Sequence, residues 1–240
     1  RSGDNETYAL RDVSLTIKQG EFVVLRGPSG SGKSSMLYIL SALRSATSGK
    51  IRFGEHQYGT ESADNLTRLR RVHFGFIFQF HFLISYLTVL ENVMVAAPEQ
   101  NTHYQAKALD FLDSLGIGKV AHRMPHQVSG GQRQRVAVAR ALIHDPQVIF
   151  ADEPTASLNT EAGLDVMRLL AEHRGERTVI MVTHDDTMSR FANRAIELRD
   201  GVVVNDGPNP AFTAAASKPA AVTAAASKPA SRRSKRSTSK

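Results

Sequence analysis

The sequence predicts an α/β domain built on a doubly wound, mostly parallel sheet. Three apolar runs have the length and the β-branched composition of buried strands, namely residues 21–26 (EFVVLR), 147–151 (QVIFA) and 177–182 (RTVIMV). Segments with helical spacing lie between them, and this alternation is typical of such a sheet. Polar or glycine-rich residues follow each run. Because open α/β sheets place their sites at the carboxyl ends of strands, these residues are the candidate site.

A glycine-rich loop follows the first strand and leads into a predicted helix over residues 34–43. Its residues fit the phosphate-loop pattern G-x-x-x-x-G-K-[ST] at every fixed position. Backbone N–H groups at a helix N-terminus favour an anion, Lys33 adds a charge for the β- and γ-phosphates, and the Ser34 hydroxyl is a ligand for Mg²⁺. The predicted ATP-binding residues here are Gly27, Pro28, Ser29, Gly30, Ser31, Gly32, Lys33, Ser34 and Ser35.

An acidic pair, Asp152 and Glu153, ends the second apolar run. Asp152 is predicted to hold Mg²⁺ through the water shell of the metal, and Glu153 to orient or deprotonate the attacking water. An apolar strand ending in two acids is common by itself. In a chain that also carries a phosphate loop, we interpret it as a catalytic feature.

A second glycine-rich start comprises Ser129, Gly130, Gly131 and Gln132. The helical pattern that follows it, residues 132–143, predicts another anion-binding helix N-terminus. One domain cannot easily fold both glycine-rich starts onto a single phosphate. We therefore expect the second to serve the ATP of a partner copy in a head-to-tail dimer, with Ser129 and Gly131 on the opposite γ-phosphate. The alternative is a helix cap that serves stability alone.

These motifs, in this order, resemble the nucleotide-binding ATPase subunit of an ABC transporter over roughly residues 7–206. Residues 128–132 (VSGGQ) resemble the family signature LSGGQ, Gln79 its Q-loop glutamine, residues 157–159 its D-loop and His184 its switch histidine. The resemblance implies that Gln79 contacts Mg²⁺ or the attacking water and senses the membrane partner. It also implies that His184 contacts the γ-phosphate.

Three features depart from the family pattern. Asn159 stands where the D-loop usually has Asp, so a charge is lost there, and Val128 replaces Leu with a similar volume. The aromatic residue that stacks on adenine in the family would fall at or before Arg1 in this sequence, so Tyr8 is not assigned that role.

Residues 72–90 contain no Asp, Glu, Lys or Arg and are long enough to cross a bilayer. His73, Gln79 and His81 argue against insertion. We predict a strand, the Gln79 loop and an aromatic segment, Phe80–Tyr86. By the resemblance this segment meets a transmembrane permease; alternatively, Phe80, Phe82 and Leu83 pack in the core.

The chain divides into an ATP-binding core at 1–79 and 144–209, a helical subdomain at 80–143 that carries the signature, and a disordered tail at 210–240. The helical subdomain includes a predicted helix at 102–115. Ser129 follows Lys33 by 96 positions, which leaves no room for the long coiled coil of chromosome-maintenance relatives. That spacing favours a transporter subunit.

The tail is rich in Ala, Ser, Lys and Pro and repeats an octapeptide at 213–220 and 223–230. Its seven Lys and Arg residues account for the whole net charge of +7, so residues 1–210 are neutral. The folded part therefore gives no case for specific nucleic-acid binding. The tail is interpreted as a solvated extension, with an anionic membrane surface as the main alternative partner of residues 218–240.

We therefore predict a cytoplasmic MgATP-hydrolysing subunit, peripheral on the inner face of the membrane through a permease. The absence of Cys fits a reducing compartment, and the N-terminal residues lack the apolar core of a signal peptide. The segments around Gln79 and Glu153 look most like the branch of macrolide-export, lipoprotein-release and heterocyst-glycolipid-export ATPases. The alternatives are a soluble ATPase acting on nucleic acid or ribosomes and a non-hydrolysing regulator, but Lys33, Glu153 and His184 are all retained.

Overall fold

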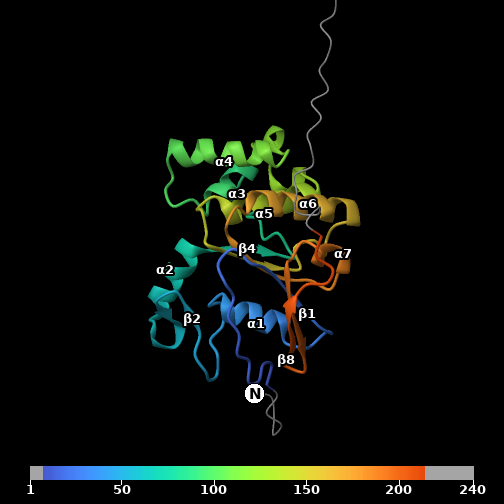
Figure 1. Ribbon diagram of the computed structural model, residues 1–240. Helices are drawn as coiled ribbons and strands as arrows, with labels where there is room; N and C mark the ends of the chain where they lie inside the picture. The colour runs from blue at the N-terminus through green and yellow to red at the C-terminus, as the bar shows by residue number, and fades with distance from the viewer. Residues whose placement is uncertain (1–7, 214–240) are drawn as a thin grey trace, which may run out of the picture.

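The computed structural model describes residues 8–213, which form a central sheet with helices on both faces (Figure 1). The strands of the main sheet are β1 (Phe22–Arg26), β4 (Phe74–Phe78), β5 (Val148–Asp152), β6 (Thr178–Val182), β7 (Arg194–Arg199) and β8 (Val202–Pro208). A small hairpin pairs β2 (Arg52–Phe53) with β3 (His56–Gln57). The helices are α1 (Lys33–Leu40), α2 (Ala63–His73), α3 (Val89–Met94), α4 (Thr102–Ser114), α5 (Gly130–Leu142), α6 (Thr160–His173) and α7 (Asp186–Ser189).

The main sheet has the strand order β4-β5-β6-β1-β7-β8. All neighbours are parallel except β7 and β8, which form an antiparallel pair. Consequently β1, β4, β5 and β6 all end at one edge, and the loops that leave them are neighbours. The α/β class with a doubly wound, mostly parallel sheet is confirmed.

Alternate residues of the strands face two separate cores, as the two-residue period of a strand requires. Phe22 and Val24 of β1 pack with α3, α4, α5 and α6, whereas Val23 and Leu25 pack with α1 and α2. In Figure 1 the first group of helices lies above the sheet and the second below it. The helix that follows the phosphate loop and the helix that follows the signature therefore cover opposite faces.

Helix α1 is shorter than its sequence pattern predicts. Apolar spacing continues to residue 43, but the helix ends at Leu40. Ala42 has a φ of 55°, in the left-handed region, and the amide of Leu43 donates to the carbonyl of Tyr38 at 2.8 Å. Such a helix-terminating turn usually contains glycine. Because Ala42 occupies that position here, the sequence pattern did not predict the end of the helix.

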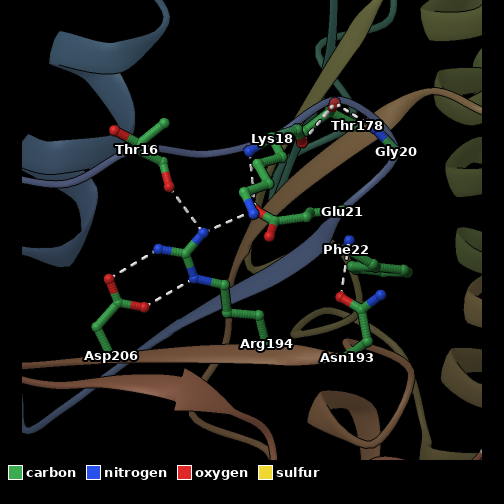
Figure 2. Close-up of polar contacts among 9 residues, drawn as sticks. All are labelled: Thr16, Lys18, Gly20, Glu21, Phe22, Thr178, Asn193, Arg194 and Asp206. Atoms are coloured by element: carbon green, nitrogen blue, oxygen red, sulfur yellow. Dashed lines mark hydrogen bonds and ion pairs between the residues drawn. The ribbon is translucent and has the colours of Figure 1, made fainter.

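Arg194 fastens three segments at the amino end of β1 (Figure 2). Its guanidinium donates to both carboxylate oxygens of Asp206 on β8 at 2.7 Å, to Glu21 at 2.7 Å and to the carbonyl of Thr16 at 2.8 Å. These contacts raise the pKa of Arg194 and lower that of Asp206. The network secures the antiparallel strand β8 and the chain entering β1, at the end of β1 away from the phosphate loop.

Residues 8–213 include some of the predicted features, and others lie outside this range. Helices α3, α4 and α5 lie within residues 80–143, and the division into domains stays a prediction. Within residues 8–213, no helix is long and apolar enough to cross a membrane. The basic segment 218–240 and the adenine-stacking position at or before Arg1 both lie outside the described residues.

Candidate nucleotide-binding site

The candidate site lies along the carboxyl edge of four adjacent parallel strands. Gln79 follows β4, Glu153 follows β5, His184 lies two residues beyond β6, and Gly27 follows β1. Because the strand order is β4-β5-β6-β1, these chain positions are brought side by side from opposite ends of the sequence. This edge is where open α/β sheets bind ligands.

The phosphate loop connects β1 to the N-terminus of α1. Gly27 has a φ of 137°, and a Cβ there would meet the carbonyl oxygen of Leu198 at 2.1 Å, so only glycine fits. The Lys33 ammonium donates to the carbonyls of Gly27 and Pro28 at 2.9 and 2.8 Å. The loop thus keeps its single ammonium beside the N–H groups that begin α1, an arrangement that suits a polyphosphate.

Ser34 and Asp152 meet beside this loop. The Ser34 hydroxyl donates to Oδ1 of Asp152 at 3.3 Å, joining the first turn of α1 to the end of β5. A hydroxyl and a carboxylate are hard oxygen donors of the kind that Mg²⁺ prefers. The residues present therefore fit the metal that the sequence predicts.

Glu153 and His184 are joined by a hydrogen bond. Nδ1 of His184 lies 2.9 Å from Oε1 of Glu153. Glu153 has a φ of 48°, in the left-handed region that side chains other than Gly, Asn and Asp seldom adopt. This local strain turns the carboxylate out of the strand, and such outliers cluster at functional sites. The contact raises the pKa of His184, through the hydrogen bond first and the carboxylate charge second.

Gln79 lies in an exposed loop after β4. Its carbonyl accepts a hydrogen bond from the Ser157 hydroxyl at 3.4 Å, so the predicted Q-loop and D-loop touch. Asn159, the departure from the D-loop pattern, caps α6 by accepting from the amide of Ala162 at 2.9 Å. Asn and Asp cap helices about equally well, so this structural contact is retained despite the lost charge.

The signature begins α5, as predicted. Ser129 is exposed, and its hydroxyl accepts from the amide of Gln132 at 3.2 Å while the Gln132 side chain accepts from the amide of Ser129 at 2.9 Å. This reciprocal capping box is the structural role that the sequence offered as an alternative. It leaves open the second role, because Cβ atoms placed on Gly130 and Gly131 would come no closer than 3.8 Å to other atoms.

The aromatic segment is divided between surface and core. Phe80 and Phe82 are each 65% exposed and Tyr86 is 78% exposed, whereas Leu83 packs against the core. The backbone of the segment is held by Arg140 of α5, which donates to the carbonyls of His81 and Phe82 at 2.7 and 2.8 Å. Exposed aromatic side chains that lie together in this way are typical of a surface that contacts a protein partner.

Three contacts around the candidate site were not predicted from the sequence. The Tyr38 hydroxyl donates to Asp152, and Arg140 donates to the carbonyl of Phe82. The buried side chain of Asn92 bonds the amide and the carbonyl of Ile84. The phosphate-loop pattern ends at Ser34, four residues before Tyr38, so the pattern assigns Tyr38 no role. The available sequence signal for Asn92 was an amide side chain among the apolar residues of segment 89–94 (VLENVM), and the structure buries it completely.

Residues 10–156 match the model of the family described as "ABC transporter". A macrolide export ATP-binding/permease protein from Bradyrhizobium diazoefficiens is 48% identical over 225 residues, covering 91% of this chain and 34% of that protein. A probable export ATP-binding/permease protein from Pseudomonas fluorescens is 45% identical over 230 residues, covering 92% of this chain and 35% of that protein. The chain thus spans about a third of the length of these relatives.

Solved structures agree with the sequence relatives. A dimeric ATP-binding cassette, MJ0796, in a post-hydrolysis state with ADP and Pi, has a TM-score of 0.78 and 39% identity. The match covers 87% of this chain and 94% of that one. A second dimeric structure of the same bacterial ABC transporter cassette also has a TM-score of 0.78, at 40% identity.

The order of motifs, the sheet edge on which they meet and these similarities agree with one another. The resemblance drawn from the motifs is confirmed, including its export branch. The chain belongs to the ABC transporter family and is an ATP-binding ATPase cassette of that family.

Proposed function

We propose that this cassette hydrolyses MgATP in a head-to-tail dimer and thereby drives a transmembrane permease of an export or lipid-envelope transport system. One observation carries the proposal. The phosphate loop, Asp152, Glu153 and His184 share one sheet edge, but the signature begins a helix on the opposite face of the sheet. A second copy supplies the missing wall of the site, and the dimeric cassettes to which the chain is similar support this arrangement.

Each residue has a role in this proposal. Lys33 and the loop amides bind the β- and γ-phosphates, and Ser34, Asp152 and Gln79 would hold Mg²⁺, which neutralises phosphate charge when bound. Glu153 orients or deprotonates the attacking water. His184, fixed by its 2.9 Å hydrogen bond to Glu153, is directed at the γ-phosphate. Ser129, Gly130, Gly131 and Gln132 reach the ATP of the partner copy.

The permease would dock on the aromatic segment Phe80–Tyr86. Beside this segment lies a groove of about 450 Å³ whose lining includes Phe76, Phe78 and Val95. The rings of Phe78 and Phe82 meet edge to face at 5.6 Å, so the groove and the exposed aromatics are continuous. Such a surface suits an amphipathic helix of a membrane protein. On this proposal the cassette is cytoplasmic and peripheral on the inner face of the membrane.

Hydrolysis is tested by Glu153→Gln. The amide cannot take a proton from water, so we expect ATP binding to persist, dimers to accumulate with ATP, and turnover to fall by at least about 100-fold. Phosphate release and size-exclusion chromatography with multi-angle light scattering measure the two effects. Turnover within twofold of the unmodified protein would remove Glu153 from its proposed role.

Glu172→Gln is the matched control. Glu172 is an exposed residue of α6. The same change of charge there should leave both ATP turnover and the oligomeric state as they are in the unmodified protein.

A further inference from the structure

Two hydroxyls from one helix hold both oxygens of the Asp152 carboxylate. Ser34 and Tyr38 are four residues apart in α1, so they lie on the same helical face. The Ser34 hydroxyl is 3.3 Å from Oδ1 of Asp152, and the Tyr38 hydroxyl donates to Oδ2 at 2.6 Å. The shorter of the two contacts is therefore made by a residue outside the phosphate-loop pattern.

The position of the Tyr38 ring is well determined. Its backbone carbonyl accepts the amides of Leu43 and Arg44 at 2.8 and 3.0 Å, in the turn that ends α1. The guanidinium of Arg44 lies over the ring, 5.5 Å from its centroid. The ring is half-buried and packs against the core below the sheet. The backbone, the ring face and the hydroxyl of Tyr38 each make a different contact. Together these contacts orient the hydroxyl toward Asp152.

The Tyr38 hydroxyl makes a contact that the ring alone does not provide. A phenylalanine would make the same apolar contacts, because it has the same ring. The phenolic O–H adds a hydrogen bond to Oδ2 of the Asp152 carboxylate at 2.6 Å, which a phenylalanine could not make. With Oδ2 occupied by a neutral donor, the carboxylate is restrained in the rotamer that points Oδ1 at Ser34.

We propose that Tyr38 is a positioning residue of the metal site, whose hydroxyl fixes the Asp152 carboxylate so that Oδ1 stays beside the Ser34 hydroxyl. This inference rests on the proposed role of Asp152 and Ser34 in holding Mg²⁺. Hydrogen bonds to metal-ligating carboxylates orient them, and their loss typically costs about 10- to 100-fold in metal affinity. Tyr38 itself touches neither the metal nor the nucleotide.

The test is the Mg²⁺ dependence of nucleotide binding by the full chain. Fluorescence of trinitrophenyl-ATP measures binding in EDTA and across a series of Mg²⁺ concentrations, without hydrolysis as the readout. For Tyr38→Phe we expect the half-saturating Mg²⁺ concentration to rise about 10-fold or more, with affinity in EDTA unchanged. Should Tyr38→Phe fail to fold by circular dichroism, Tyr38→Met carries the same expectation.

Tyr58→Phe is the matched control. The Tyr58 hydroxyl donates to the carbonyl of Leu40 at 2.9 Å, so it also closes onto α1 but does not reach Asp152. Its loss should leave the Mg²⁺ titration unchanged. A shift of equal size in Tyr58→Phe would mean that general loosening of α1 explains the effect, and it would overturn the proposal.

A double-mutant cycle separates this inference from the function on which it rests. Asp152→Asn should raise the half-saturating Mg²⁺ concentration, and adding Tyr38→Phe to it should have no further effect, because the two residues act through one contact. If Asp152→Asn impairs the Mg²⁺ response and Tyr38→Phe does not, positioning by Tyr38 is overturned and the metal site stands. If neither variant changes the response, both the metal assignment and the inference are overturned.

Discussion

Glu153, the predicted catalytic acid, has an unusual backbone conformation. Its φ of 48° is strained for a side chain of this size, and the fold maintains it with a hydrogen bond from its amide to the carbonyl of Val182 at 2.9 Å. The strand on which the acid pair lies would otherwise send alternate side chains to opposite faces. Because the left-handed residue follows β5 directly, Asp152 reaches α1 while Glu153 reaches His184.

The pairing with Glu153 predicts how His184 titrates. Since the pKa of His184 is raised in the folded protein, its imidazolium form contributes to the stability of the fold. This contribution is fully present below the ordinary pKa of His and is lost as pH rises through the raised pKa. We expect the ring resonances of His184 to titrate above pH 6.5 in the nucleotide-free protein, and lower in Glu153→Gln. NMR of labelled histidines measures both midpoints.

His144 provides the internal control for that titration. Burial lowers its pKa, and its ring bonds the carbonyl of Phe74 at 3.0 Å, not the carboxylate of Glu153. Its midpoint should be the same in both proteins. Equal midpoints for His184 in the two proteins would contradict the contact with Glu153.

At the scale of elements, β4 and α5 pack closely against each other. Strand β4 leads into the Gln79 loop and α5 begins at the signature, so their packing relates the two loops. Gly75 makes this contact close: a Cβ there would lie 2.4 Å from the carbonyl oxygen of Ala141. Backbone atoms on both sides cannot move as a flexible side chain can.

Gly75→Ala should therefore destabilise the fold. Overpacking of this kind costs about 1–3 kcal/mol, and we expect about 2 kcal/mol or more in the free energy of unfolding. Urea unfolding followed by circular dichroism measures it. Gly207→Ala is the control, since Gly207 also lies in a strand but no atom is within 4 Å of an added Cβ. A similar loss in both variants would refute the steric explanation.

At the scale of the whole molecule, the sheet separates the two glycine-rich helix starts. Helix α1 covers one face and α5 the other, each with its own core. In the proposed head-to-tail dimer, a second copy turned to face the first brings its signature to the phosphate loop. A dimer interface of this kind is formed with the ligand and is expected to depend on its concentration.

Ser129→Arg tests this composite site. In the Glu153→Gln background, the bulky cation at the signature should abolish the ATP-induced dimer while ATP binding to the monomer is retained. Light scattering and trinitrophenyl-ATP titration measure the two properties. ATP-induced dimers that persist with Ser129→Arg would refute the head-to-tail assignment.

Ser62→Arg is a close control, because Ser62 caps α2 by the same contact with which Ser129 caps α5. Each hydroxyl accepts the amide three residues on at 3.2 Å. Loss of a helix cap alone costs about 1 kcal/mol. ATP-dependent dimers of Ser62→Arg should therefore form normally.

The sequence by itself determined the fold class, the family and the residues at the strand ends. Gly27, Asp152 and His184 could be identified because each belongs to a local pattern, a loop or an apolar run with its end, whose chemistry is set within a few residues. Local patterns also predicted β1, β5, β6 and α5 to within a residue or two of where they begin and end.

Only the tertiary structure decided which side chains support those residues. Tyr38 bonds Asp152 across 114 positions of sequence, Arg140 bonds Phe82 across 58, and Arg194 bonds Glu21 across 173. None of these pairs has a local signal, because the order of strands in the sheet is set by packing of distant elements. Where a side chain points, and which distant residue it can contact, is decided only by that packing. The sequence therefore identified the candidate site residues, and the fold determined their partners.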